Sequence, residues 1–274
     1  MSEKIHLLQT LRKERIEKGI LFTNSFSSAF LFFLAGIKER IGYATQGRRI
    51  LLTHPIPLPS HWDKLHQIDY YAHLFQRLGW VGEERKPSLY LTPEEVERTK
   101  RKFSLKDKNW IGICPGSAYG ESKRWLPEYF RELVKKIIHS LSYGVMVLGR
   151  EEERKIGEFI LENHPRQRAL NLCGKTTLRE AIALLSLTQV VVTNDSGLMH
   201  IASTLGIPTV AIFGPTPVEK TAPRQGKVKV LKKDVPCSPC KFRDCPLDHR
   251  CMKEISPEEV WRAVKEFLGN YRSK

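Results

Sequence analysis

Short apolar runs alternate with amphipathic stretches between about residues 96 and 235 of this chain. The runs are rich in Val and Ile and end at Gly, Asn or Asp, as buried strands do, whereas the stretches between them carry apolar residues at helical spacing. This alternation predicts a doubly wound α/β domain, in which helices cover both faces of a parallel sheet. Its strands are expected at "NWIGICPG", "YGVMVLG", "ALNLCG", "QVVVTND" and "PTVAIFG", and its helices at 126–139, 151–162 and "TLREAIALLSLT".

The first 95 residues follow a sparser pattern. Strands are expected at "GILFTNS" and "RIGY", a buried helix at "SSAFLFFLAG", and a Pro-rich loop, "HPIPLPSHWDK", before a helix at "LHQIDYYAHLFQRLGW". Thr92, Pro93 and Glu95 form the signature of a helix start, a capping box with Pro at the first helical position. We therefore expect a partial Rossmann-like domain at residues 1–95 and a larger one at 96–274, which ends in an amphipathic helix.

The composition is that of a globular protein. The chain has 274 residues, 41% of them hydrophobic, and its most apolar N-terminal stretch, 29–37, is far shorter than the roughly 20 residues of a membrane span. No secretory leader pattern appears, so we expect a cytoplasmic protein. The formal net charge of +15 attracts nucleic acid, an acidic membrane surface or phosphorylated substrates, unless it only reflects a thermophile-like surface. A nucleic-acid partner is not expected, because no aromatic-basic RNA motif or recognition helix is present.

Polar residues follow the predicted strand "QVVVTND". Asn194, Asp195, Ser196 and Gly197 stand at its end, and His200 falls near the first turn of the next helix. Ligands of open parallel sheets bind at this end of the strands, where a helix N-terminus presents unpaired N–H groups and a partial positive charge. The alternative is that Asp195 or Ser196 only caps the helix and that His200 is an ordinary helix residue.

Two further strand ends carry similar residues. The loop "CPGSAYGESKRW" places Lys123 and Arg124 just before a helix, and "FGPTP" supplies Gly214 and Thr216. Small residues expose backbone N–H groups and cations neutralise charge, so the first loop suits an anion, although it matches neither a dinucleotide fingerprint nor a P-loop. Three polar strand ends on one rim indicate a nucleotide or sugar-nucleotide cleft.

The same segments resemble one enzyme family. The similarity to the C-terminal half of the bacterial ADP-heptose:lipopolysaccharide heptosyltransferases, glycosyltransferase family 9, rests on "CPGSAYGESKRWLPEYF", "NLCGKTTLREAIAL", "VVTNDSGLMHIASTLGIPTVAIFGPTP" and "CSPCKFRDCPLDHRCM". Upstream, "NSFSSAFLFFLAGIKERIGY" is similar to the acceptor-side domain of that family. The resemblance runs from about Gly19 to Trp261 and is strongest to the heptosyltransferase II group.

This resemblance implies a GT-B fold and inverting, metal-independent transfer of L-glycero-D-manno-heptose from ADP-heptose to the inner core of lipopolysaccharide. The acceptor would be heptosyl-Kdo-lipid A, at the inner face of the cytoplasmic membrane. The expected catalytic residues are Lys123 and Asp195, with Lys123 and backbone dipoles stabilising the charge of the leaving diphosphate. The donor-binding residues that it implies are Gly116, Ser117, Lys123, Thr176, Asn194, Asp195, Ser196, Gly197 and His200.

The N-terminal part departs from the family pattern. Family members begin with a strand, a Gly-Asp turn and a helix, and the aspartate of that turn is the general base; nothing before Gly19 matches this. The first βα units of the usual domain are thus expected to be absent, which leaves the general base unassigned. Three explanations stay open: a shortened reading frame, which we favour because the sheet would otherwise expose an apolar edge, another carboxylate such as Asp69, or donor binding without efficient transfer.

A cysteine cluster follows the last predicted strand, in the loop 236–252, to which we assign no catalytic role. It contains Cys237, Cys240, Cys245 and Cys251. Four thiols so close together are typical of a structural zinc or iron–sulfur site, with His249 as a spare ligand. Only the first pair has the CxxC spacing, so disulfides and free thiols remain alternatives.

Several other polar residues have both a structural and a functional interpretation. One glutamate of "EEER", 151–154, could hold ribose hydroxyls, or all could simply suit the N-terminus of a helix. Thr176 and Thr177 either cap the next helix or, in the case of Thr176 with Lys175, face the adenosine. Three residues at helical spacing in the first domain are expected to pack rather than to act as a base: His66, Tyr70 and His73.

The leading functional hypothesis is therefore a lipopolysaccharide heptosyltransferase. One alternative is a family member with another acceptor, because acceptor choice depends on the N-terminal domain. Another is a catalytically weak sugar-nucleotide-binding protein, which would bind ADP-heptose without transferring the sugar.

Overall fold

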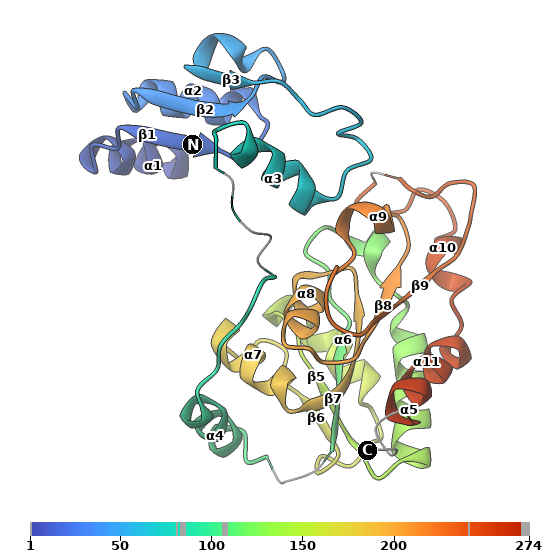
Figure 1. The fold of residues 1–274 in the computed structure, drawn as a ribbon. Helices are drawn as coiled ribbons and strands as arrows, with labels where there is room; N and C mark the ends of the chain where they lie inside the picture. Colours follow the sequence, from blue (N-terminus) through green and yellow to red (C-terminus); the bar gives the residue numbers. More distant parts are fainter. Residues whose placement is uncertain (1, 81, 83–85, 106–108, 241, 270–274) are drawn as a thin grey trace. The chain divides into compact units, whose positions relative to one another are not determined.

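The protein is described by a computed structural model that covers residues 2–80, 82, 86–105, 109–240 and 242–269 (Figure 1). The chain divides into two compact units, residues 1–85 and 86–274. A three-stranded parallel sheet forms the centre of the first unit and a six-stranded parallel sheet that of the second. The α/β class with two parallel sheets is therefore confirmed.

The second unit has the order of a doubly wound fold. Its strands are β4 (Trp110–Cys114), β5 (Gly144–Val147), β6 (Ala169–Asn171), β7 (Thr188–Asn194), β8 (Thr209–Phe213) and β9 (Val228–Lys232). All are parallel and lie in the order β6-β5-β4-β7-β8-β9, so the winding direction reverses between β4 and β7. A crevice opens at the carboxyl ends of the two strands that flank such a switch point.

Helices cover both faces of this sheet. They are α4 (Pro93–Lys102), α5 (Pro127–Ser140), α6 (Arg154–Ile160), α7 (Leu178–Ser186), α8 (Gly197–Thr204), α9 (Val218–Thr221), α10 (Arg250–Lys253) and α11 (Pro257–Gly269). Alternate side chains of β4 enter opposite cores: Ile111 and Ile113 pack with residues of α5 and α11, and Trp110 and Cys114 with residues of α7 and α8. Burial on both faces explains why the strands are almost uniformly apolar.

The structure contains two strands that the apolar pattern does not predict. In β9, valines alternate with lysines because the strand lies at the edge of the sheet, where charged side chains discourage pairing with other chains. The other, β3 (His54–Ile56), lies in the segment expected to be a Pro-rich loop. It is also an edge strand, and such a position tolerates Pro55 because the missing N–H is not needed in the sheet.

In the first unit, β1 (Lys18–Leu21), β2 (Glu39–Tyr43) and β3 pair in chain order, with α1 (Ser2–Lys13), α2 (Phe26–Leu34) and α3 (Gln67–Gln76). The three residues at helical spacing belong to the packing of α3. His66 caps the helix through Nδ1, Tyr70 is buried, and His73 Nδ1 lies 2.9 Å from the hydroxyl of Tyr43.

Helix α2 is not the buried helix that its sequence predicts. Ala29 is buried, but Phe26, Phe30 and Phe33 are 42–50% exposed and their rings stack in a row. The sequence is apolar on every side of the helix, whereas only one side packs on the sheet. The exposed row therefore cannot be recognised from hydrophobicity alone.

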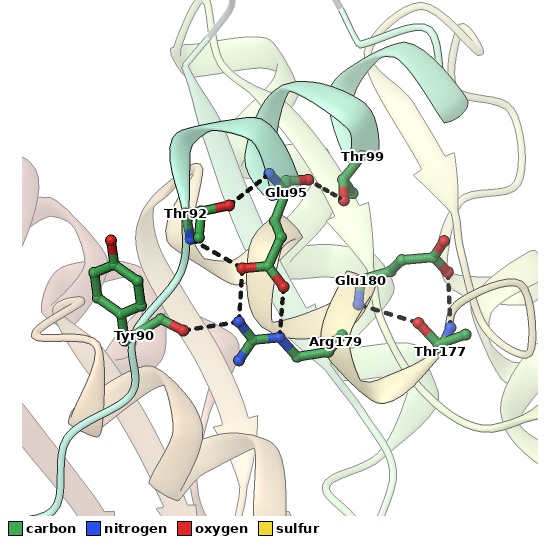
Figure 2. A network of polar contacts seen from close by, with 7 residues as sticks. All are labelled: Tyr90, Thr92, Glu95, Thr99, Thr177, Arg179 and Glu180. Carbon is green, nitrogen blue, oxygen red and sulfur yellow. Dashed lines mark hydrogen bonds and ion pairs between the residues drawn. The ribbon is translucent and has the colours of Figure 1, made fainter.

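A polar network joins α4 to α7 (Figure 2). The predicted capping box is present: Glu95 N donates to Thr92 Oγ1 and Thr92 N to Glu95 Oε2. Thr177 and Glu180 form the same arrangement at the start of α7, so Thr177 is a helix cap. The Arg179 guanidinium donates to both carboxylate oxygens of Glu95, at 2.9 and 2.7 Å. The network fixes the start of α7.

We expect the stability that this network provides to disappear in acid. The Arg179 guanidinium, together with the Thr92 amide, lowers the pKa of Glu95 from 4.5 to about 2. A carboxylate with a lowered folded-state pKa stabilises the fold above its unfolded pKa and stops doing so as the pH falls through the folded one. The loss of thermal stability in Glu95→Gln should thus be constant at neutral pH and shrink between pH 4.5 and about 2. Glu97→Gln, in the same helix, is the control. If Glu95→Gln still unfolds at a lower temperature than the wild type at a pH of about 2, the prediction is contradicted.

Candidate functional site

Two loops meet at the switch point of the second sheet. The loop 115–124 follows β4 and the turn 194–197 follows β7. Because Cys114 pairs with Thr193 in the sheet, both segments leave it at the same level. The strand ends selected by the sequence are thus neighbours in the fold.

Asn194 ties the loop 115–124 to the end of β7. Its side chain is fully buried; the amide oxygen accepts a hydrogen bond from Trp125 N at 3.0 Å, and the amide nitrogen donates to Pro115 O at 2.7 Å. Both polar groups of the amide are used within the protein. Asn194 therefore holds the two ends of the loop in place, and its contact with the donor stays a prediction.

Three strand ends converge on the carboxylate of Asp195. This side chain is 7% exposed, and its Oδ2 accepts hydrogen bonds from Lys123 Nζ and from Thr216 Oγ1, both at 2.7 Å. The Lys123 ammonium also lies 4.9 Å from the centroid of the Tyr119 ring. A nearly buried ammonium group is thus held at the switch point by a carboxylate and an aromatic ring, in an environment where electrostatic interactions are strong.

A cavity of about 550 Å³ lies at the same loops. Its volume is in the range of small-molecule sites, and most of its walls are apolar. The predicted donor-binding residues that line it are Gly116, Ser117, Thr176, Ser196 and Gly197. Lys123 and Asp195 belong to the same loops without lining the cavity, and His200 is an exposed residue of α8 outside its lining.

The N-terminus of α8 borders this cavity. The Ser196 hydroxyl does not cap the helix but lies 3.2 Å from Thr193 Oγ1, so the first N–H groups of the helix are left without a side-chain cap. A Cβ atom added to Gly197 would meet no atom within 4 Å. Ser196 occupies the N-cap position, but its side chain does not cap the helix. An uncapped helix start with open space in front of it suits an anion.

We expect Gly197→Ala to impair ligand binding without harming the fold. The added methyl group meets open space, so the substitution should be neutral or stabilise by about 0.4–1 kcal/mol. We expect a donor phosphate to approach the helix through the volume that the methyl group would fill, so a clash of about 1–3 kcal/mol should weaken ADP binding roughly 5- to 150-fold. Calorimetry with ADP measures this. Gly269→Ala, also a helical glycine facing open space, is the control; equal affinities of both variants would contradict the placement of the phosphates.

Two glutamates after β5 have different surroundings. Glu153 is 3% exposed, and its Oε1 lies 4.0 Å from Arg124 Nη2. Its carboxyl group packs against Gly116, where an added Cβ would lie only 2.3 Å away. Both glutamates line the cavity, but Glu151 is exposed. The two therefore differ in exposure: Glu151 is open to a ligand, and the nearly buried Glu153 shapes the loop beside it.

The cysteine cluster is neither a metal site nor a disulfide pair in this structure. All six cysteines are free, and among the residues that the structure describes no three His, Cys, Asp or Glu side chains are grouped to hold a metal ion. Burial and the neighbouring thiols raise the pKa of Cys251 to about 11, so the free thiol is protonated at neutral pH. The expectation of zinc, an iron–sulfur cluster or disulfides at Cys237, Cys240, Cys245 and Cys251 is thus not borne out.

Sequence reasoning did not single out Trp125, and it considered Glu153 only as one of the glutamates of 151–154; both shape the loop through contacts with residues far away in the chain. A buried carboxylate beside a glycine has no recognisable sequence pattern.

In the described part of the chain, no helix has both the length and the apolar character needed to cross a membrane.

Comparisons with known proteins agree with this architecture. The profile of glycosyltransferase family 9 (heptosyltransferase) matches residues 5–250. Lipooligosaccharide heptosyltransferase 2 of Haemophilus influenzae is 31% identical over 272 residues, covering 94% of this chain and 78% of the relative. Lipopolysaccharide heptosyltransferase 2 of Escherichia coli is 30% identical over 281 residues, with 98% and 80% covered. The solved structure of the E. coli ADP-heptose lipopolysaccharide heptosyltransferase II superimposes with a TM-score of 0.82 at 28% identity, over 99% of this chain and 82% of that one.

Proposed function

The chain belongs to glycosyltransferase family 9, the heptosyltransferases, and from this premise we propose that it transfers L-glycero-D-manno-heptose from ADP-heptose to the inner core of lipopolysaccharide. The observation that carries the proposal is the cluster of Lys123, Asp195 and Thr216 on the loops of a nucleotide-sized cavity. A cation held at a strand end beside an uncapped helix start is suited to a sugar diphosphate.

The geometry supports one orientation of the donor. The adenosine lies in the cavity, where Thr176 lines the wall and Glu151 is placed to accept hydrogen bonds from the ribose hydroxyls. The diphosphate lies between the backbone of Gly116 and Ser117 and the N-terminus of α8. The heptose then points toward Lys123 and Asp195.

In the reaction, a hydroxyl oxygen of the acceptor attacks the anomeric carbon from the face opposite the diphosphate. The bond from that carbon to the phosphate oxygen breaks, and ADP leaves with the electron pair. Lys123 and the dipole of α8 stabilise the negative charge that develops on the leaving diphosphate. We propose that these groups do so without a metal ion.

The acceptor hydroxyl must also lose its proton, and Asp69 is the carboxylate that the sequence singles out for this. It lies in the first turn of α3, in the first unit. General-base catalysis contributes about 10²- to 10⁴-fold to a rate, so Asp69→Asn distinguishes the possibilities. A fall of that size in kcat with unchanged ADP affinity would identify the base, and an unchanged kcat would exclude Asp69.

We propose heptosyl-Kdo-lipid A as the acceptor and the cytoplasmic face of the inner membrane as the place of action. The net charge of +15 supports contact with a membrane surface and an acceptor that both carry negative charge. Nucleic acid is not a proposed partner.

The test combines a transfer assay with calorimetry on the same preparation. We expect the protein to bind ADP and to transfer heptose from ADP-heptose to heptosyl-Kdo-lipid A. Binding without transfer to any inner-core acceptor would favour a sugar-nucleotide-binding protein of this family. A protein that binds neither ADP nor ADP-heptose would overturn the proposal.

A further inference from the structure

The cysteine-rich loop, residues 236–252, packs against the two loops that meet at Asp195. Ser122 directly precedes Lys123, and all three of its polar groups form hydrogen bonds with this loop. Ser122 N donates to Arg243 O at 2.8 Å, its hydroxyl donates to Phe242 O at 2.7 Å, and Ser122 O lies 2.8 Å from His249 Nε2. Ser122 is 2% exposed, so these bonds are shielded from water.

The approach between these segments is too close for a side chain. A Cβ atom added to Gly120 would lie 2.4 Å from Arg243 O. On the outer side, the ring of Tyr119 has the Lys123 ammonium 4.9 Å and the Arg243 guanidinium 5.6 Å from its centroid. Residues 119–123 are therefore held against the cysteine-rich loop on both sides of Gly120.

The other end of the cysteine-rich loop holds the loop that carries Thr216. Cys240 N donates to Pro215 O at 2.8 Å, and the Ser238 hydroxyl donates to Gly214 O at 2.7 Å. One segment therefore contacts the residues next to Lys123 and the residues next to Thr216. These are the two groups that donate hydrogen bonds to Asp195 Oδ2.

We propose that the cysteine-rich loop positions Lys123 for the donor diphosphate, with His249 as the main positioning residue. The loop fixes the backbone on one side of Lys123, while Asp195 fixes its ammonium group. His249 Nε2 donates to Ser122 O, and loss of this bond lets the 119–123 segment move relative to Asp195. This inference rests on the proposed role of Lys123 at the donor.

The test is a double-mutant cycle on ADP affinity, measured by calorimetry with the full chain. His249→Ala should weaken ADP binding about 3- to 10-fold, the value of one hydrogen bond. In the background of Lys123→Met the same change should have less than about a twofold effect, because the group that it positions is gone. A residue with a merely structural role would have equal effects in both backgrounds.

Two variants serve as controls. His249→Gln keeps an N–H donor at a similar reach and should restore most of the affinity; since His249 has a φ of 59°, the backbone strain is common to Gln and Ala. Asp248→Asn alters an exposed neighbour that pairs with Arg250, and it should leave the affinity unchanged. If His249→Ala does not fold, Ser238→Ala removes one of the two hydrogen bonds at the other end of the loop and should also show coupling to Lys123.

The outcomes separate this inference from the proposed function. If Lys123→Met weakens ADP binding but His249→Ala does not, or acts equally in both backgrounds, the positioning role is refuted and the proposed function stands. If the wild-type protein binds no ADP, or Lys123→Met binds it as well as the wild type, the proposed donor site is refuted, and the positioning role with it.

Discussion

Lys123→Met should lower kcat for heptose transfer about 10²- to 10³-fold, the effect typical of removing one preorganised group that stabilises transition-state charge. The leaving diphosphate gains negative charge as the glycosidic bond breaks. The Lys123 side chain is only 12% exposed and its ammonium group is held by Asp195, so it meets that charge without reorganisation and with little screening by water. Methionine preserves the length and apolar stem of the side chain. Steady-state kinetics with saturating ADP-heptose measure the change.

The control is a second lysine with a carboxylate partner. Lys136 Nζ lies 3.0 Å from Glu258 Oε2 on the surface of the protein, so Lys136→Met removes an equivalent charge far from the cavity and should leave kcat unchanged. Because Lys123→Met leaves Asp195 buried with Thr216 as its remaining donor, its stability should fall as well. Kinetics are therefore measured well below its unfolding temperature. A kcat equal to that of the wild type would refute the role of Lys123.

The fold of the second unit follows from the sequence because its physical signals are local. Each buried strand is a continuous apolar run, and α4 and α7 each begin at a local capping box. Edge strands lack this signal. In β9 four of the five residues are lysines or partly exposed valines, and β3 contains Pro55, so neither resembles a buried strand.

The candidate site could be predicted only as far as chain order and sheet topology determine it. Polar strand ends of a parallel sheet must share one rim, and the structure brings Lys123, Asp195 and Thr216 together there. The contacts made by His249 depend on tertiary packing across 127 positions of the chain. From the sequence alone, a metal or disulfide site is expected for the loop that contains His249, because four closely spaced cysteines form a recognisable pattern. A hydrogen bond to a backbone carbonyl leaves no pattern in the sequence.

Asn194→Ala should be the most destabilising substitution at the site. It removes the partners of Trp125 N and Pro115 O, both in buried residues, and an unsatisfied buried backbone group costs about 1–3 kcal/mol. With two such groups the loss is about 2–6 kcal/mol, and each kcal/mol lowers the unfolding temperature by about 2–4 °C in a unit of this size. Both attachments of the 115–124 loop are lost at once, so ADP affinity should fall in the protein that remains folded. Thermal unfolding and calorimetry measure the two effects.

Asn171 supplies a matched comparison at the end of β6, the edge strand of the same sheet. Its amide oxygen accepts from Cys173 N at 3.1 Å and its amide nitrogen donates to Arg154 O at 3.0 Å, the same two-bond pattern as in Asn194. Asn171 is partly exposed, so water can replace the lost bonds, and Asn171→Ala should cost less than half as much and leave ADP affinity unchanged. Equal effects of the two variants on stability would mean that burial does not determine the loss of stability. Equal effects on ADP affinity would mean that Asn194 does not hold the 115–124 loop. A larger effect of Asn194→Ala than of Asn171→Ala on both stability and ADP affinity would show that the buried amide of Asn194 fixes the geometry of the 115–124 loop.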